Sequence, residues 1–201
     1  MSGGAIAPKH VFRRAATSIG VAVAIFEFLQ CAPLGMMRPP AAFSEGRRNE
    51  IGLGAVAVSP RPYVDEPWSQ AGQMWISRQA LPWLHVSAIA AFDARAAAVG
   101  LAGRALYMRG RRFGAGVDAE LGYGWGALGL PFGFRLIDET WLYASPRVGN
   151  YGLQPMFGLP MGISVNLQGG AFLRMEYQTS WVNLMAFEHR SHAGASLAVQ
   201  W

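Results

Sequence analysis

Alternation of apolar and polar residues is the dominant pattern in the second half of the chain. Between Phe113 and Trp125 the odd positions are apolar, whereas the even positions hold glycine, Asp118 or Glu120. Because successive side chains of a strand point to opposite faces, this pattern predicts a strand with one wholly apolar face. A helix would place the two carboxylates inside that apolar surface. We therefore expect a strand here.

The same alternation predicts strands over most of the chain. We expect eight of them, near residues 50–58, 73–92, 97–108, 112–125, 128–143, 157–167, 171–181 and 190–201. The alanine-rich stretch from Leu84 to Met108 also fits a helix, although its first part alternates. Pro131 and Pro160 fall within expected strands, where each removes a ladder hydrogen bond, so we expect bulges or strand ends there.

Composition indicates which class of protein carries these strands. The chain is 52% hydrophobic but only 14% charged, against about 25% charged residues in a typical soluble domain. The only continuous apolar run lies near the N-terminus, so the chain lacks the spans of about 20 residues that a bundle of membrane helices needs. Apolar character without such spans is typical of membrane-crossing strands.

The last strand carries the most specific resemblance. Leu197, Val199 and Trp201 are large apolar residues at alternate positions. This ending resembles the C-terminal signal that the outer-membrane assembly machinery recognises. The whole chain resembles the small bacterial outer-membrane β-barrels of the eight-stranded, OmpA/OmpX-like size class. This resemblance implies an all-β, antiparallel, up-and-down transmembrane barrel in the outer membrane of a Gram-negative cell. Its partners would be outer-membrane lipid and the barrel-assembly machinery.

The resemblance also implies an orientation for each connection. The last strand of such barrels returns to the periplasm, which makes 168–170, 125–128 and 93–96 periplasmic turns. The connections 59–72, 144–156 and 182–190 then lie outside the cell. Short periplasmic turns and longer outer loops are typical of bacterial barrels.

The first 42 residues have the order of a secretory leader. A basic region from Lys9 to Arg14 precedes the apolar stretch 15–26, and small residues and prolines follow over 32–42. We expect a leader over 1–42 and a barrel domain over 43–201. An uncleaved anchor helix over about 15–34 is the alternative.

Cys31 is the only cysteine, so no disulfide can form within the chain. Its surroundings resemble a lipobox, although Gln30 stands where such motifs have a small residue. Lipidation of Cys31 and its loss with the leader are therefore both open.

The basic net charge does not indicate a nucleic-acid partner. The formal charge is +5, but residues 1–42 hold four of the 17 basic residues and one of the 12 acidic ones, which leaves only +2 for the rest. A nucleic-acid site needs a concentrated basic face. The cluster from Arg109 to Arg112 is interpreted as a solvated turn. We find no motif for a metal or another cofactor.

The alternation also predicts what fills the barrel. An eight-stranded bore is just wide enough for side chains to fill, so free diffusion through it is not expected. Opposite charges buried together tend to pair, because an isolated buried ion is costly. We expect a salt-bridge plug in which Asp118 and Glu120 face Arg135, and Arg174 lies beside Glu176; a narrow proton or ion path would use the same side chains. The expected inward-facing residues are Arg104, Asp118, Glu120, Arg135, Glu139, Arg174 and Glu176, with His85, Gln178 and His192.

Three functions remain open on the sequence. The favoured one is a structural or surface-interaction protein that meets a partner through the loops Pro60–Gln73 and Ser145–Met156. The second is a lipid-modifying hydrolase, because His189 and Ser191 share a strand face and resemble the His-x-Ser of lipid A deacylases. The third is a narrow channel or small-ligand transporter. A soluble periplasmic barrel is the alternative to membrane insertion, and no enzymatic activity is assigned.

Overall fold

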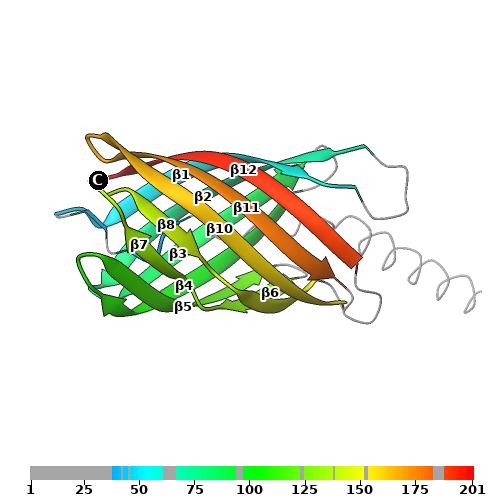
Figure 1. The fold of residues 1–201 in the computed structure, drawn as a ribbon, viewed down its shortest axis with the longest axis horizontal. Coiled ribbons are helices and arrows are strands. Elements are labelled where there is room, and N and C mark those ends of the chain that lie inside the picture. The colour runs from blue at the N-terminus through cyan, green and yellow to red at the C-terminus, as the bar shows by residue number, and fades with distance from the viewer. Residues whose placement is uncertain are drawn as a thin grey trace, which may run out of the picture.

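The protein folds into an antiparallel β-barrel with strongly tilted strands (Figure 1). The computed structural model describes residues 38–41, 43–44, 46–60, 67–93, 97–122, 125–137, 139–151, 154–182 and 188–201. The expected apolar stretch 15–26 and Cys31 lie outside these residues. Within the described part of the chain, no helix is long and apolar enough to cross a membrane.

Twelve strand segments make up the described part of the barrel. They are β1 (Asn49–Val58), β2 (Ser69–Leu81), β3 (Leu84–Asp93), β4 (Ala97–Arg109), β5 (Phe113–Gly122), β6 (Trp125–Gly129), β7 (Phe132–Arg135), β8 (Trp141–Ala144), β9 (Arg147–Tyr151), β10 (Gln154–Gln168), β11 (Ala171–Val182) and β12 (Glu188–Gln200).

Pairing of the first and last strands closes the barrel. β12 runs antiparallel to β1 from the Glu50–Gln200 pair to the Val58–His192 pair. Between β5 and β10 the wall contains two strand positions, filled by β6 and β9 in one half and by β7 and β8 in the other. The closed ring therefore has ten strands, and the expected number of eight is wrong.

One of the two missing strands was hidden in the expected strand 73–92. That segment is a hairpin in which β2 and β3 are joined at Pro82 and Trp83. The register pairs Trp75 with Ile89 and Ser77 with Ser87, so odd residues face inward on both strands. Because the parity does not change across the turn, the alternation continues through it and resembles a single long strand.

The other missing strand was hidden by prolines. The expected strand 128–143 and the expected loop 144–156 form two neighbouring wall strands, each interrupted once. The interruptions lie at Pro131 and Pro146, which have no N–H to give to the ladder. Their carbonyls still take part, because Pro131 O accepts from Gly116 N and Pro146 O accepts from Leu130 N, each at 2.9 Å. Pro160, by contrast, lies within β10 in register with Gln178.

The extra strands change the end at which several connections lie. We call the end that holds Trp201 and the start of β1 the terminal end (marked C in Figure 1), and the opposite one the far end. The turn after Gln168 lies at the terminal end, as expected. The connections at 94–96 and 123–124 fall at the far end, not with that turn as expected, because residues 125–151 form two wall strands and not the single one expected.

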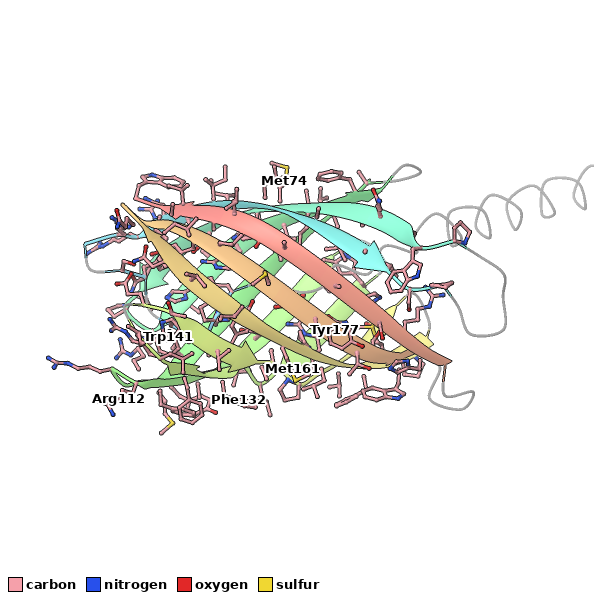
Figure 2. The ribbon with its side chains drawn as sticks, turned by 45° about the horizontal axis from the view of Figure 1, so that its top comes forward. Met74, Arg112, Phe132, Trp141, Met161 and Tyr177 are labelled. Atoms are coloured by element: carbon pink, nitrogen blue, oxygen red, sulfur yellow. The ribbon has the colours of Figure 1, made fainter. Side chains whose placement is uncertain are left out.

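The two faces of the wall differ in chemistry. Exposed side chains of the outer face include Leu53, Val99, Leu101 and Leu121, which are 60–73% exposed, and Figure 2 shows Met74 projecting from this face. Charged and polar residues such as Glu50 and Arg104 are buried inside the barrel. An apolar outer face with a polar interior is the reverse of a soluble protein and fits a wall in contact with lipid.

Inside the barrel, aromatic rings lie against glycines of neighbouring strands. A Cβ added to Gly52 would lie 2.0 Å from the Trp75 ring, and one added to Gly162 would lie 2.6 Å from the Tyr143 ring. Gly103 on β4 has no heavy atom within 4 Å of such a Cβ. The glycines under the rings therefore let large side chains lie flat along the wall.

We expect Gly52→Ala to destabilise the barrel by about 1–3 kcal/mol, because the new methyl group displaces the Trp75 ring. The matched control is Gly103→Ala, which should leave the stability unchanged or raise it slightly. Urea titration of the refolded barrel, followed by Trp fluorescence, measures both. Equal stabilities of the two variants would contradict the packing described here.

Candidate functional site

A buried carboxylate on the first strand is the centre of the interior. Glu50 has no exposed surface, and Arg174 on β11 donates to both of its oxygens, at 2.9 and 2.7 Å. Trp75 Nε1 on β2 and Gln200 Nε2 on β12 donate to the same carboxylate, at 2.9 and 2.8 Å. Arg38 adds a longer ion pair at 3.7 Å. Glu50 thus links the four neighbouring strands β11, β12, β1 and β2 across the closure seam.

A second ion pair reaches into the lumen from β4 and β5. Arg104 and Asp118 are direct neighbours in the register, and two guanidinium nitrogens bind the two carboxylate oxygens at 2.6 and 2.8 Å. The remaining terminal nitrogen of Arg104 donates to the backbone carbonyls of Arg38 and Pro39, at 2.7 and 2.9 Å. Arg104 therefore holds a segment of chain that is not part of the wall.

That segment, residues 38–41 and 43–44, lies inside the barrel at the terminal end, and we call it the plug segment. The Arg38 guanidinium is stacked on the Phe43 ring at 3.9 Å, and Phe43 meets the His85 ring edge-on with centroids 4.9 Å apart. Pro40 packs against Gly114 and Gly133 of the wall. Burial lowers the pKa of Arg38 to about 10 although Glu50 opposes this effect, so Arg38 remains cationic at neutral pH.

The plug segment is also bound to the rim of the barrel. Ser44 N donates to Gln200 Oε1 and its hydroxyl donates to Glu139, each at 3.0 Å. Asn166 Nδ2 donates to the same Glu139 oxygen at 2.8 Å. The segment is therefore held by side chains from both the wall and the terminal turns.

A further layer of charged side chains lies between the plug segment and the far end of the barrel. Arg147 on β9 donates to Glu120 on β5 at 3.2 Å, and both side chains are at most 4% exposed. Tyr143 crosses over Gly162, which is in register with Glu176. The lumen in this region is thus lined by groups of both charges.

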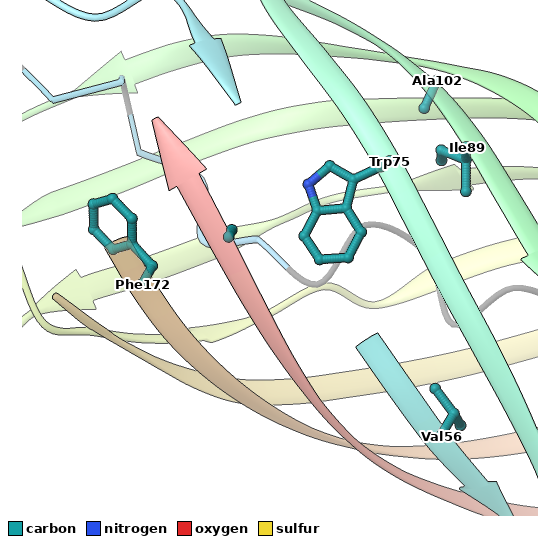
Figure 3. Close-up of a cluster of buried hydrophobic side chains, with 6 residues drawn as sticks. Val56, Trp75, Ile89, Ala102 and Phe172 are labelled. Atoms are coloured by element: carbon teal, nitrogen blue, oxygen red, sulfur yellow. The ribbon is translucent and has the colours of Figure 1, made fainter. Parts of the chain in front are cut away.

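The interior also contains an apolar cluster. It consists of Val56, Trp75, Ile89, Ala102, Phe172 and Ala198 (Figure 3). Arg174 lies 5.5 Å from the Phe172 ring and 5.9 Å from the Trp75 ring. The Glu50–Arg174 pair is therefore enclosed by aromatic surface, which excludes water and strengthens the ionic attraction.

The structure places most of the expected inward residues inside the barrel but gives several of them other partners. Asp118 and Glu120 pair with Arg104 and Arg147, not with Arg135 as expected. Arg135 ends β7 at the terminal end, because the break at Pro131 and the turn after it shift its position. Glu139 lies in that turn.

Arg174 reaches across β12 to Glu50 and does not pair with its strand neighbour Glu176 as expected. Three residues of the site were not predicted as inward-facing: Glu50, Arg38 and Arg147. Arg38 falls in the expected leader 1–42, and Arg147 falls in the expected loop 144–156. For Glu50 the signal was present, since Ile51 and Leu53 are large and apolar and must face lipid.

The expected catalytic pair lies on the outer face near the far end. The Ser191 hydroxyl is hydrogen-bonded to Tyr177 Oη at 2.8 Å, and His189 Nε2 is bonded to the Thr179 hydroxyl at 2.5 Å. The two side chains thus share a face as expected, and each is bonded to β11. Their catalytic role stays a prediction. In the described ranges, no group of three or more His, Cys, Asp or Glu side chains could hold a metal ion.

Solved structures show where this fold occurs. The COG4313 outer membrane channel from Pseudomonas putida F1 aligns with a TM-score of 0.53 at 7% identity, covering 86% of this chain and 100% of that one. The KdgM porin in complex with disordered oligogalacturonate aligns at 0.49 and 8% identity, covering 76% and 99%. Neisserial surface protein A aligns at 0.38 and 9% identity, covering 78% and 98%.

No protein-family model matches the chain, and no curated protein matches it in sequence. The fold is nevertheless that of outer-membrane β-barrels, which supports the expected localisation in the outer membrane.

We expect Glu50→Gln to destabilise the barrel by about 3–5 kcal/mol, because it leaves the buried Arg174 and Arg38 cations without a carboxylate. The matched control is Glu139→Gln at the partly exposed terminal turn, which should cost less than about 1 kcal/mol. Heat-modifiable gel mobility and urea titration measure the difference. A Glu50→Gln barrel as stable as the control would show that the Glu50 cluster does not hold the seam.

Proposed function

We propose that the protein is an outer-membrane channel for small polar solutes that the plug segment keeps closed. The observation that carries this proposal is the contact of Arg104 with the backbone carbonyls of Arg38 and Pro39. Because Arg104 binds backbone atoms, this contact does not depend on the side chains of the plug segment. The plug segment is therefore a structural part of the lumen.

The width of the barrel supports conduction once the plug segment is displaced. Barrel diameter grows about linearly with strand number, so ten strands give a bore about a quarter wider than the eight that were expected. The lumen beyond the plug segment presents the Glu120–Arg147 pair, Gln178 and Ser164. Since acidic and basic groups are both present, we expect weak charge selectivity. The Pseudomonas putida neighbour is an outer membrane channel, so the fold is compatible with this activity.

A permanently closed, structural barrel is the second candidate, and a specific observation favours it. The Glu50–Arg174 and Arg104–Asp118 pairs hold nearby strands of the wall together without help from the plug segment, as a purely structural barrel requires. Surface contacts would then come from the longer far-end connections, 59–68 and 183–187. The expected loop Ser145–Met156 no longer serves this role, since most of it lies in β9 and β10.

The proposal requires the exported protein to keep residues 38–44, although the sequence analysis assigned 1–42 to the leader. We therefore expect the leader to be removed before Arg38. Intact-mass measurement and N-terminal sequencing of the protein purified from membranes locate the cleavage site. A mature chain that begins at or after residue 45 would lack the plug segment and contradict the proposal.

We expect deletion of residues 38–44 to raise the conductance of the barrel in planar lipid bilayers well above that of the mostly closed wild type. The deletion should leave the barrel folded, because Glu50 keeps Arg174, Trp75 and Gln200 as donors.

A variant that keeps the plug segment provides the matched control. Gly103→Ala changes β4 at a position where an added Cβ meets no heavy atom within 4 Å, so the plug segment keeps its contacts. This variant should conduct no more than the wild type. A folded deletion variant that conducts no more than the wild type would leave only the structural candidate.

A further inference from the structure

The terminal end of the barrel carries a ring of arginines that the proposed channel does not use. They come from the segment before β1, from β2, from the β4–β5 turn and from the end of β7: Arg47, Arg48, Arg78, Arg109, Arg111, Arg112 and Arg135. Figure 2 shows Arg112 at this end of the molecule. We name this set the arginine rim.

The arginine rim has almost no acidic counterpart in the described part of the structure. Of the carboxylates described at this end, Glu50 is buried inside the barrel with Arg174, and Ser44 and Asn166 already donate to Glu139. Within the described residues, the ion pairs all lie inside the barrel and include no member of the rim. The rim is therefore a site of uncompensated positive charge.

The rim lies where the apolar wall ends. Arg78 is in register with Asn49, which exchanges backbone hydrogen bonds with Trp201, and the next outward residue above Arg78 is Ile76, 52% exposed. Trp83, Tyr107 and Trp201 are 45–66% exposed at the same end. Exposed Trp and Tyr side chains at the edge of an apolar band mark the level of the lipid headgroups.

We propose that the arginine rim binds the phosphate groups of anionic phospholipids in the leaflet that meets the terminal end. Guanidinium groups match phosphate oxygens in pairs, and long arginine side chains reach the headgroups while their stems stay on apolar surface. The rim follows the wall from β1 to β7, and Arg47 covers the β10–β11 turn at Gly170. A lipid annulus contacts all of these sectors at once, whereas a protein partner would contact one.

Native mass spectrometry of the protein, released from micelles with equal amounts of phosphatidylglycerol and phosphatidylcholine, tests the proposal. The wild type should retain phosphatidylglycerol over phosphatidylcholine by about fivefold or more, and added salt should reduce this preference. The variant that combines Arg78→Gln, Arg109→Gln, Arg111→Gln and Arg112→Gln should lose most of it. These side chains have no described partners, so the variant should remain folded, which gel mobility verifies.

Two control variants test whether the lipid preference depends on the charge of the rim and on its position. The corresponding four Arg→Lys changes should keep most of the preference, since they retain the charge. Arg190→Gln, which removes an arginine from the far half of β12, should keep all of it. No preference in the wild type, or an unchanged preference in the folded Gln variant, would overturn the proposal. So would binding of soluble poly-aspartate to the rim without any lipid preference.

Discussion

The hydrogen-bonded ion pair between Glu50 and Arg174 is the interaction on which the rest of the interior depends. A closed barrel must join its first and last strands, and Glu50 lies at the terminal end of that seam, in register with Gln200. A buried charge is tolerated only when its partners satisfy it. The carboxylate has donors from β2, β11 and β12, and Arg38 of the plug segment lies against it. Closure and plugging thus share one buried group.

Contact with lipid explains why the interior has to be built in this way. The outer face must be apolar, so the polar side chains of each strand are turned inward and must find partners there. Charged side chains pair with partners on the same or nearby parts of the inner wall, and rings such as Trp75 lie flat over glycines. A ten-stranded wall encloses more space than an eight-stranded one. The plug segment occupies part of that space at the terminal end.

The two ends of the barrel are chemically different. The Glu50–Arg174 pair, the plug segment and the arginine rim all lie at the terminal end, whereas β1 and β11 both end at the far end. Arg104 connects the wall to the plug segment at the terminal end. One edge of its guanidinium binds Asp118, and its remaining terminal nitrogen donates to backbone carbonyls of the plug segment. The same side chain therefore binds both the wall and the plug segment.

The sequence by itself determined the class of fold and the direction of most side chains. Alternation is a local property, so the strands near 157–167, 171–181 and 190–201 and the burial of Arg104, Asp118 and Glu176 follow from neighbouring residues alone. The number of strands does not follow, because the turn at Pro82 and Trp83 preserves the alternation; the 20-residue length of the expected strand 73–92, far above the 9–11 residues that cross a membrane, was the available warning. Pairing partners were decided only by the tertiary structure. Glu50 and Arg174 are 124 positions apart, and only closure of the ring brings them together.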